Sequence, residues 1–135
     1  MTRPLLLIDV DLPLSPEHGG ELLILAERFE LAWATTGKGE ANGLIGPELG
    51  LPELPFIDCP AMQEGAPGDT FWKTQYVLEY AAGGPFAWVD DDITAHDRAY
   101  VRENHLAAAL LLHVDPGTGL VRADFDALAD WAAAL

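Results

Sequence analysis

The residues best suited to chemistry form two acidic clusters, each directly after an apolar run: Asp9-Val10-Asp11 and Asp90-Asp91-Asp92. A carboxylate at the end of a buried strand is costly to desolvate unless a cation or hydrogen-bond donors compensate it. Because side chains alternate along a strand, Asp9 and Asp11 are expected on the same side of the chain. With a facing aspartate from the second cluster, they would supply the carboxylate oxygens that Mg²⁺ prefers.

Such a site is suited to phosphoryl transfer. Once the metal neutralises its charge, Asp9 would attack a phosphoryl group and form an aspartyl-phosphate, which water then hydrolyses. Asp11 would protonate the leaving oxygen and afterwards activate the water. A threonine hydroxyl and a lysine ammonium would hold the phosphoryl oxygens, and the candidates are Thr35 or its neighbour Thr36, and Lys73.

The elements that position these residues follow from apolar runs of strand length that alternate with segments of helical period. Strands are expected at 5–10, 31–35, 56–59, 86–89 and 108–114, and helices at 16–29, 40–49, 69–82, 94–104 and 122–133. This alternation is typical of an α/β domain with a five-stranded parallel sheet, and without repeats or linkers residues 1–135 form a single domain. Right-handed crossovers would bring all the carboxyl ends of the strands to one edge, where ligands of such sheets bind.

Composition narrows the function further. Seven Lys and Arg residues against 22 Asp and Glu residues give a formal charge of −15, which would repel a nucleic acid and makes a divalent cation useful for binding a phosphate. The single cysteine, Cys59, excludes an internal disulfide, and the histidines lack zinc-binding spacing. With no stretch long enough to span a membrane and no signal-peptide pattern, we expect a soluble, cytoplasmic protein without a membrane partner.

The order of these residues resembles the four motifs of the haloacid dehalogenase superfamily of phosphatases, from Leu5 to about Thr94. The resemblance implies a three-layer Rossmann-like fold with helices on both faces of the sheet. It also implies roles for the candidates: Asp9 as nucleophile, Asp11 as general acid/base, Thr35 and Lys73 as phosphate-binding groups, and Asp9, Asp11, Asp90 and Asp91 around Mg²⁺. The expected function is therefore that of a Mg²⁺-dependent phosphohydrolase that acts on a phosphomonoester.

The chain departs from the family pattern after Asp11, where Leu12-Pro13 replaces a glycine followed by threonine or valine. Pro13 has no backbone N–H to donate, and Leu12 lacks the conformational range of glycine. Between Asp11 and the helix expected at Pro16 there is no room for an inserted cap domain. We therefore expect a capless, open site that accepts a small or macromolecular phosphorylated substrate and is compatible with a homodimer.

Two alternatives remain open on the sequence. One is a catalytically weakened protein of this fold that serves in binding or assembly. The other is a receiver-like phospho-acceptor domain. In such a domain the phosphorylated aspartate would follow the third strand, near Asp58, and the lysine would follow the fifth strand. Here Lys73 precedes the Asp90 cluster, so this alternative is disfavoured. Asp92, the last acid of the second cluster, is expected to cap the following helix.

Overall fold

A parallel sheet of five strands forms the centre of the molecule in the computed structural model, which describes residues 3–9, 16–35, 46–58, 74–91, 93–115 and 117–135. Of Thr35 and Asp58, only the backbone is described. The strands are β1 (Leu5–Ile8), β2 (Glu30–Thr35), β3 (Phe56–Asp58), β4 (Phe86–Asp90) and β5 (Ala109–His113). Their order in the sheet is β3-β2-β1-β4-β5, and every neighbouring pair is parallel. The expectation of a five-stranded parallel α/β fold is confirmed.

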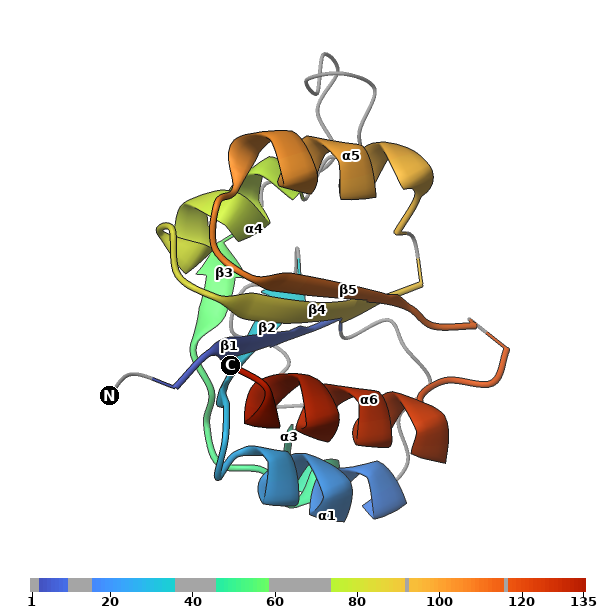
Figure 1. Cartoon of the computed structure of the whole chain (residues 1–135). Helices are drawn as coiled ribbons and strands as arrows, with labels where there is room; N and C mark the ends of the chain where they lie inside the picture. Colours follow the sequence, from blue (N-terminus) through green and yellow to red (C-terminus); the bar gives the residue numbers. More distant parts are fainter. Residues whose placement is uncertain (1–2, 10–15, 36–45, 59–73, 92, 116) are drawn as a thin grey trace.

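Helices cover both faces of this sheet (Figure 1). On one face lie α1 (Pro16–Leu25), α3 (Gly46–Leu49) and α6 (Arg122–Ala133), and on the other lie α4 (Thr74–Ala81) and α5 (Ala95–Asn104). The layers are thus helix, sheet and helix, as in Rossmann-like folds. No helix among the described residues has the length and apolar character needed to cross a membrane.

The core has two halves, one on each face of the sheet. Along β1, Leu6 and Ile8 belong to the half packed under α1 and α6, whereas Leu7 belongs to the half under α4 and α5. Because both faces of β1 and β4 are covered, their residues form continuous apolar runs rather than alternating with polar ones. Trp33 and Trp88 are fully buried in opposite halves and are the largest side chains of the interior.

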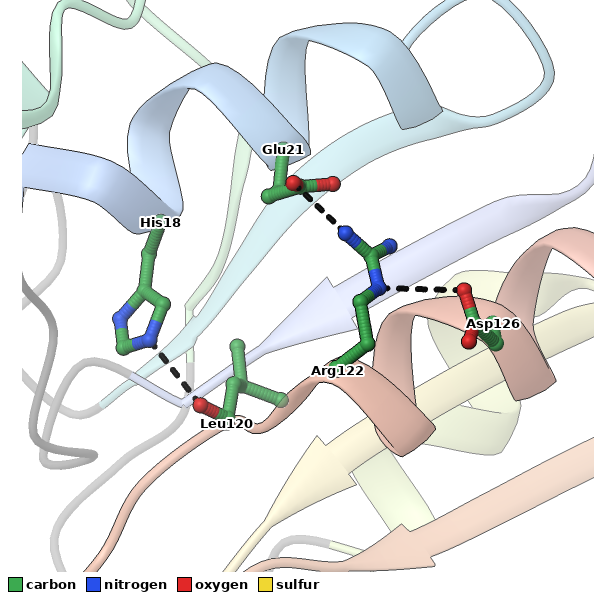
Figure 2. Close-up of polar contacts among 5 residues, drawn as sticks. All are labelled: His18, Glu21, Leu120, Arg122 and Asp126. Atoms are coloured by element: carbon green, nitrogen blue, oxygen red, sulfur yellow. Dashed lines mark hydrogen bonds and ion pairs between the residues drawn. The ribbon is translucent and has the colours of Figure 1, made fainter.

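Polar contacts join α1 to the start of α6 (Figure 2). The Arg122 guanidinium donates to Glu21 on α1 at 2.7 Å and to Asp126 on its own helix at 3.1 Å. The Nε2 atom of His18 lies 3.0 Å from the carbonyl oxygen of Leu120. Because the Arg122 side chain is 61% exposed, solvent screens its ion pairs, and the packing of the two helices rests mainly on their buried apolar residues.

Several boundaries differ from those expected. The first helix ends at Leu25 rather than at Phe29, because the chain turns there to bury Phe29 against Trp131 before β2 begins. Of the helix expected at 40–49, α3 covers Gly46–Leu49, and residues 40–45 lie outside the described part. The strands expected at 86–89 and 108–114 run at Phe86–Asp90 and Ala109–His113, whereas the closing helix at 122–133 is confirmed.

The expected stop of α3 at Gly50 is confirmed. Gly50 has a φ of 73°, which a glycine adopts without strain. Its N–H donates to the carbonyl of Pro47, and the N–H of Leu51 donates to that of Gly46. This pair of bonds ends the helix by satisfying carbonyls of its last turn.

The cap expected at Asp92 is wrong. The N-cap of α5 is Thr94, whose extended backbone precedes the first helical residue, Ala95. Its hydroxyl accepts from the N–H of Asp97, and the Asp97 carboxylate accepts in return from the N–H of Thr94 at 2.8 Å. A threonine followed three residues later by an acid forms this reciprocal capping box, so the helix begins two residues later than a cap at Asp92 requires.

Candidate metal centre

Three carboxylates converge at the carboxyl ends of β1 and β4. We call Asp9, Asp90 and Asp91 the acid cluster, because one carboxylate oxygen from each lies within 4.8 Å of the other two. The two strands are direct neighbours, and their register pairs Ile8 with Val89. The next residue of each strand is an aspartate, so the register alone brings Asp9 beside Asp90.

Main-chain hydrogen bonds of the sheet hold the acid cluster in place. The N–H of Asp9 donates to the carbonyl of Val89 at 3.2 Å. On the other side of β4, the N–H of Val114 donates to the carbonyl of Asp90 at 3.0 Å. The two buried acids are therefore carried by rigid strands, which fixes a site more accurately than a loop does.

The acid cluster lies where the direction of the chain across the sheet reverses. From β1 the chain moves outward through β2 to β3, and it then returns to place β4 on the opposite side of β1. The crossovers on the two sides of this point lie on opposite faces of the sheet (Figure 1). In open α/β sheets, ligands bind in the crevice at the carboxyl ends of the strands that flank such a reversal.

Burial makes the acid cluster electrostatically demanding. Asp9 is 1% exposed and Asp90 is fully buried, whereas Asp91 is partly exposed. At this limiting separation of 4.8 Å, two charged carboxylates would repel each other by about 3–4 kcal/mol at an effective dielectric constant near 20. A divalent cation would turn this repulsion into attraction, which is the physical reason to consider a metal here.

The donor set fits Mg²⁺. This ion takes oxygen ligands at about 2.0–2.1 Å in octahedral geometry, so two of its ligands are separated by about 3 Å when adjacent and about 4 Å when opposite. The oxygens of the acid cluster already lie within 4.8 Å of one another, so the widest separation needs to shrink by less than about 1 Å. Asp91 is the member with room to make this adjustment, because its side chain is only partly buried.

The other predicted site residues lie partly or wholly outside the described part of the chain. Asp11 and Lys73 lie outside the described residues, as does Thr36. Thr35 is the last residue of β2, at the edge of the sheet where the acid cluster lies, and its side chain is likewise outside the described part. The structure thus brings together three of the four acids expected around the metal.

Two residues outside the set predicted from the sequence connect to this region. Asp97 and Thr74 are both fully buried, and the Thr74 hydroxyl donates to Oδ1 of Asp97 at 2.6 Å. The spacing of Thr94 and Asp97 is a capping signal that could have marked Asp97 in the sequence. No local pattern marks Thr74, because its partner comes from another helix.

A cavity of about 380 Å³ lies away from the acid cluster, between α5 and β5, and is lined in part by Arg98, Arg102 and His105. Arg98 donates to the carbonyl of Leu111 at 2.8 Å and so covers part of the free edge of β5. None of the predicted site residues within the described part of the chain lines this cavity.

No family model matches the chain, and no curated protein and no solved structure matches it. The resemblance to the haloacid dehalogenase superfamily therefore rests on the order of the motifs in the sequence. The fold and the acid cluster are the structural observations from which a function can be argued.

Proposed function

We propose that the protein is a Mg²⁺-dependent phosphohydrolase of the haloacid dehalogenase type that acts on a phosphomonoester. The observation that carries the proposal is the acid cluster at the chain reversal between β1 and β4. Two almost fully buried carboxylates from adjacent strands, with a third beside them, form a donor set for a hard cation. The sequence order of Asp9, Thr35, Lys73 and Asp90-Asp91 supports the choice of phosphoryl chemistry.

In the proposed reaction, an oxygen of Asp9 attacks the phosphorus of the substrate while the bond to the leaving oxygen breaks. Asp11 gives its proton to that leaving oxygen, which departs as an alcohol. Asp11 then takes a proton from a water molecule, which attacks the phosphorus of the aspartyl-phosphate and releases inorganic phosphate together with free Asp9. Thr35 and Lys73 hold the phosphoryl oxygens throughout.

Asp9, Asp90 and Asp91 would hold the metal, together with the main-chain carbonyl of Asp11. When bound, Mg²⁺ neutralises the acids and offsets the negative charge of the phosphoryl oxygens. Without such compensation, the charged acid cluster would repel the phosphate that Asp9 is to attack.

The strand order argues against a receiver-like domain. In doubly wound folds of that type the order is 2-1-3-4-5, so the third strand is central and lies next to the first. Here β3 is an edge strand and pairs only with β2 among the described strands, with Asp58 opposite Thr35. An aspartate at the end of β3 is therefore separated from Asp9 by a whole strand.

The test is release of phosphate from an aryl phosphate with Mg²⁺ and with EDTA. We expect turnover that requires the metal and falls to background in Asp9→Asn, because an amide at this position is not a nucleophile. Circular dichroism and a thermal melt would verify that the variant is folded. Metal-independent turnover, or full activity in folded Asp9→Asn, would refute the mechanism; metal binding without turnover would favour the catalytically weakened binding protein.

A further inference from the structure

A buried carboxylate joins the beginnings of α4 and α5. Oδ1 of Asp97 accepts from the Thr74 hydroxyl at 2.6 Å, and Oδ2 accepts from the N–H and the hydroxyl of Thr94 at 2.8 and 3.0 Å. Asp97 and Thr74 are both fully buried. Hydrogen bonds to a buried charged acceptor are stronger than neutral ones, and the loss of such a partner costs more than its average contribution.

The two helix ends that Asp97 joins lead directly to residues of the proposed site. Thr74 is the first residue of α4 and is bonded covalently to Lys73. Thr94 precedes α5 and is separated from Asp91 by two residues, of which Ile93 is buried in the core. The segment with the metal-binding acids and the segment after the phosphate-binding lysine therefore meet at one side chain.

We propose that Asp97 is a positioning residue for the acid cluster: through Thr94 it fixes the segment that carries Asp91, and through Thr74 it fixes the start of α4, which follows Lys73 in the sequence. The inference extends the proposed function, since the lysine matters only if a phosphate is bound. The part of the inference that concerns metal binding rests on the acid cluster and does not require a phosphate. Partners outside the ligand sphere that fix the orientation of metal ligands commonly change metal affinity or activity by about 10- to 100-fold when they are lost.

The inference can be tested with four variants. Asp97→Asn keeps the shape of the side chain but replaces one acceptor oxygen by a donor. Thr74→Val replaces the hydroxyl by a methyl group, and Thr74→Ser keeps the hydroxyl. The matched control is Asp124→Asn on α6, because Asp124 also stands at the third position of a helix and accepts from the N–H of Val121 at 2.9 Å, whereas α6 lies on the other face of the sheet from α4 and α5 (Figure 1).

The main measurement is the dissociation constant of Mn²⁺, followed by electron paramagnetic resonance and restricted to the component that Asp9→Asn abolishes. We expect Asp97→Asn to weaken this component by about tenfold or more, and Thr74→Val to weaken it by a smaller factor that Thr74→Ser restores. Asp124→Asn should leave it unchanged while lowering the melting temperature. The second measurement is kcat/KM for the aryl phosphate, in which Thr74→Val should show a decrease and Thr74→Ser recovery.

The outcomes separate this inference from the proposed function. If the wild type binds Mn²⁺ but releases no phosphate, the proposed function fails, and the Mn²⁺ series alone decides the role of Asp97. Unchanged Mn²⁺ affinity in folded Asp97→Asn overturns the inference, and so does an equal loss in Asp124→Asn, which would mark a general effect of helix capping. If Asp97→Asn does not fold, the two Thr74 variants decide the question. Equal Mn²⁺ affinity in Thr74→Val and Thr74→Ser then overturns the inference. Absence of Mn²⁺ binding at Asp9 in the wild type overturns both proposals.

Discussion

Replacing Asp91 by Asn is the most direct test of the electrostatics of the acid cluster. The change keeps the size of the side chain and removes a charge within 4.8 Å of two other carboxylates. Each repulsion is about 0.9 kcal/mol at the dielectric constant of water and about 3.5 kcal/mol at an effective value near 20. Because Asp91 is partly exposed, solvent screens both repulsions toward the lower figure. In the absence of metal we therefore expect Asp91→Asn to be more stable than the wild type, by up to about 2 kcal/mol.

The assay is thermal and urea unfolding in EDTA, repeated across a titration with Mg²⁺. A gain of about 2 kcal/mol corresponds to a rise of roughly 5–10 °C in melting temperature for a chain of this size. Mg²⁺ should reverse the ranking, because a ligand at 100 times its dissociation constant stabilises the wild type by about 2.7 kcal/mol and the variant has lost one of the ligands.

The control for a general decrease of negative charge is Glu53→Gln, an exposed position in the loop before β3. It should change stability much less than Asp91→Asn and should leave the response to Mg²⁺ intact. The reasoning is refuted if Asp91→Asn is less stable than the wild type in EDTA, or if Mg²⁺ stabilises both proteins equally.

Two further predictions concern the fold. Gly19→Ala should destabilise the protein by about 1–3 kcal/mol, because the new Cβ would lie 1.8 Å from the carbonyl oxygen of Leu49. The Cβ of Gly20→Ala would meet open space, so this variant should stabilise the protein by up to about 1 kcal/mol. Urea unfolding measures both effects. Equal effects of the two alanines would contradict the close packing of α1 on α3. Burial, and secondly the charge of Glu30, raise the pKa of Tyr80 above its ordinary value of 10.0, so the folded state holds this proton more tightly than the unfolded chain. The stability from this difference is fully present below pH 10 and is lost as the pH rises through the folded pKa. Tyr80→Phe should therefore lose less stability than the wild type when the pH is raised above 10. Identical curves of unfolding free energy against pH for the two proteins would contradict the shift.

Much of the fold was predictable because each central strand has a strong local signal. The apolar runs that end at Asp9 and at Asp90 are too short for helices of usual length. They are also uninterrupted by polar residues, which is typical of strands covered on both faces of the sheet. Once the strands are parallel, their carboxyl ends share an edge, and acids that follow two of them become neighbours if the strands pair. The structure shows that β1 and β4 do pair, which explains why Asp9 and Asp90 could be grouped from the sequence.

The errors arose where tertiary contacts or competing local signals decide. Apolar periodicity continues to Phe29, but the chain leaves the helix earlier because this ring packs against Trp131 from the last helix. Asp92 and Thr94 are both good N-cap residues, and the acid at Asp97 selects Thr94 by completing the capping box. The bond from Thr74 to Asp97 joins two helices and has no signature in either one.

The register between β1 and β4 also links the proposed metal binding to correct folding. Asp9 and Asp90 are far apart in the sequence, so their meeting requires closure of a long loop that contains β2, β3 and α4. A slip of one residue between the strands would bring the main chain of Asp9 level with that of Val89 and turn side chains to the wrong face of the sheet. A chain with correct helices but a shifted central pair of strands would therefore lack the proposed cation site. Binding of the ion would then follow, rather than precede, completion of the long-range pairing.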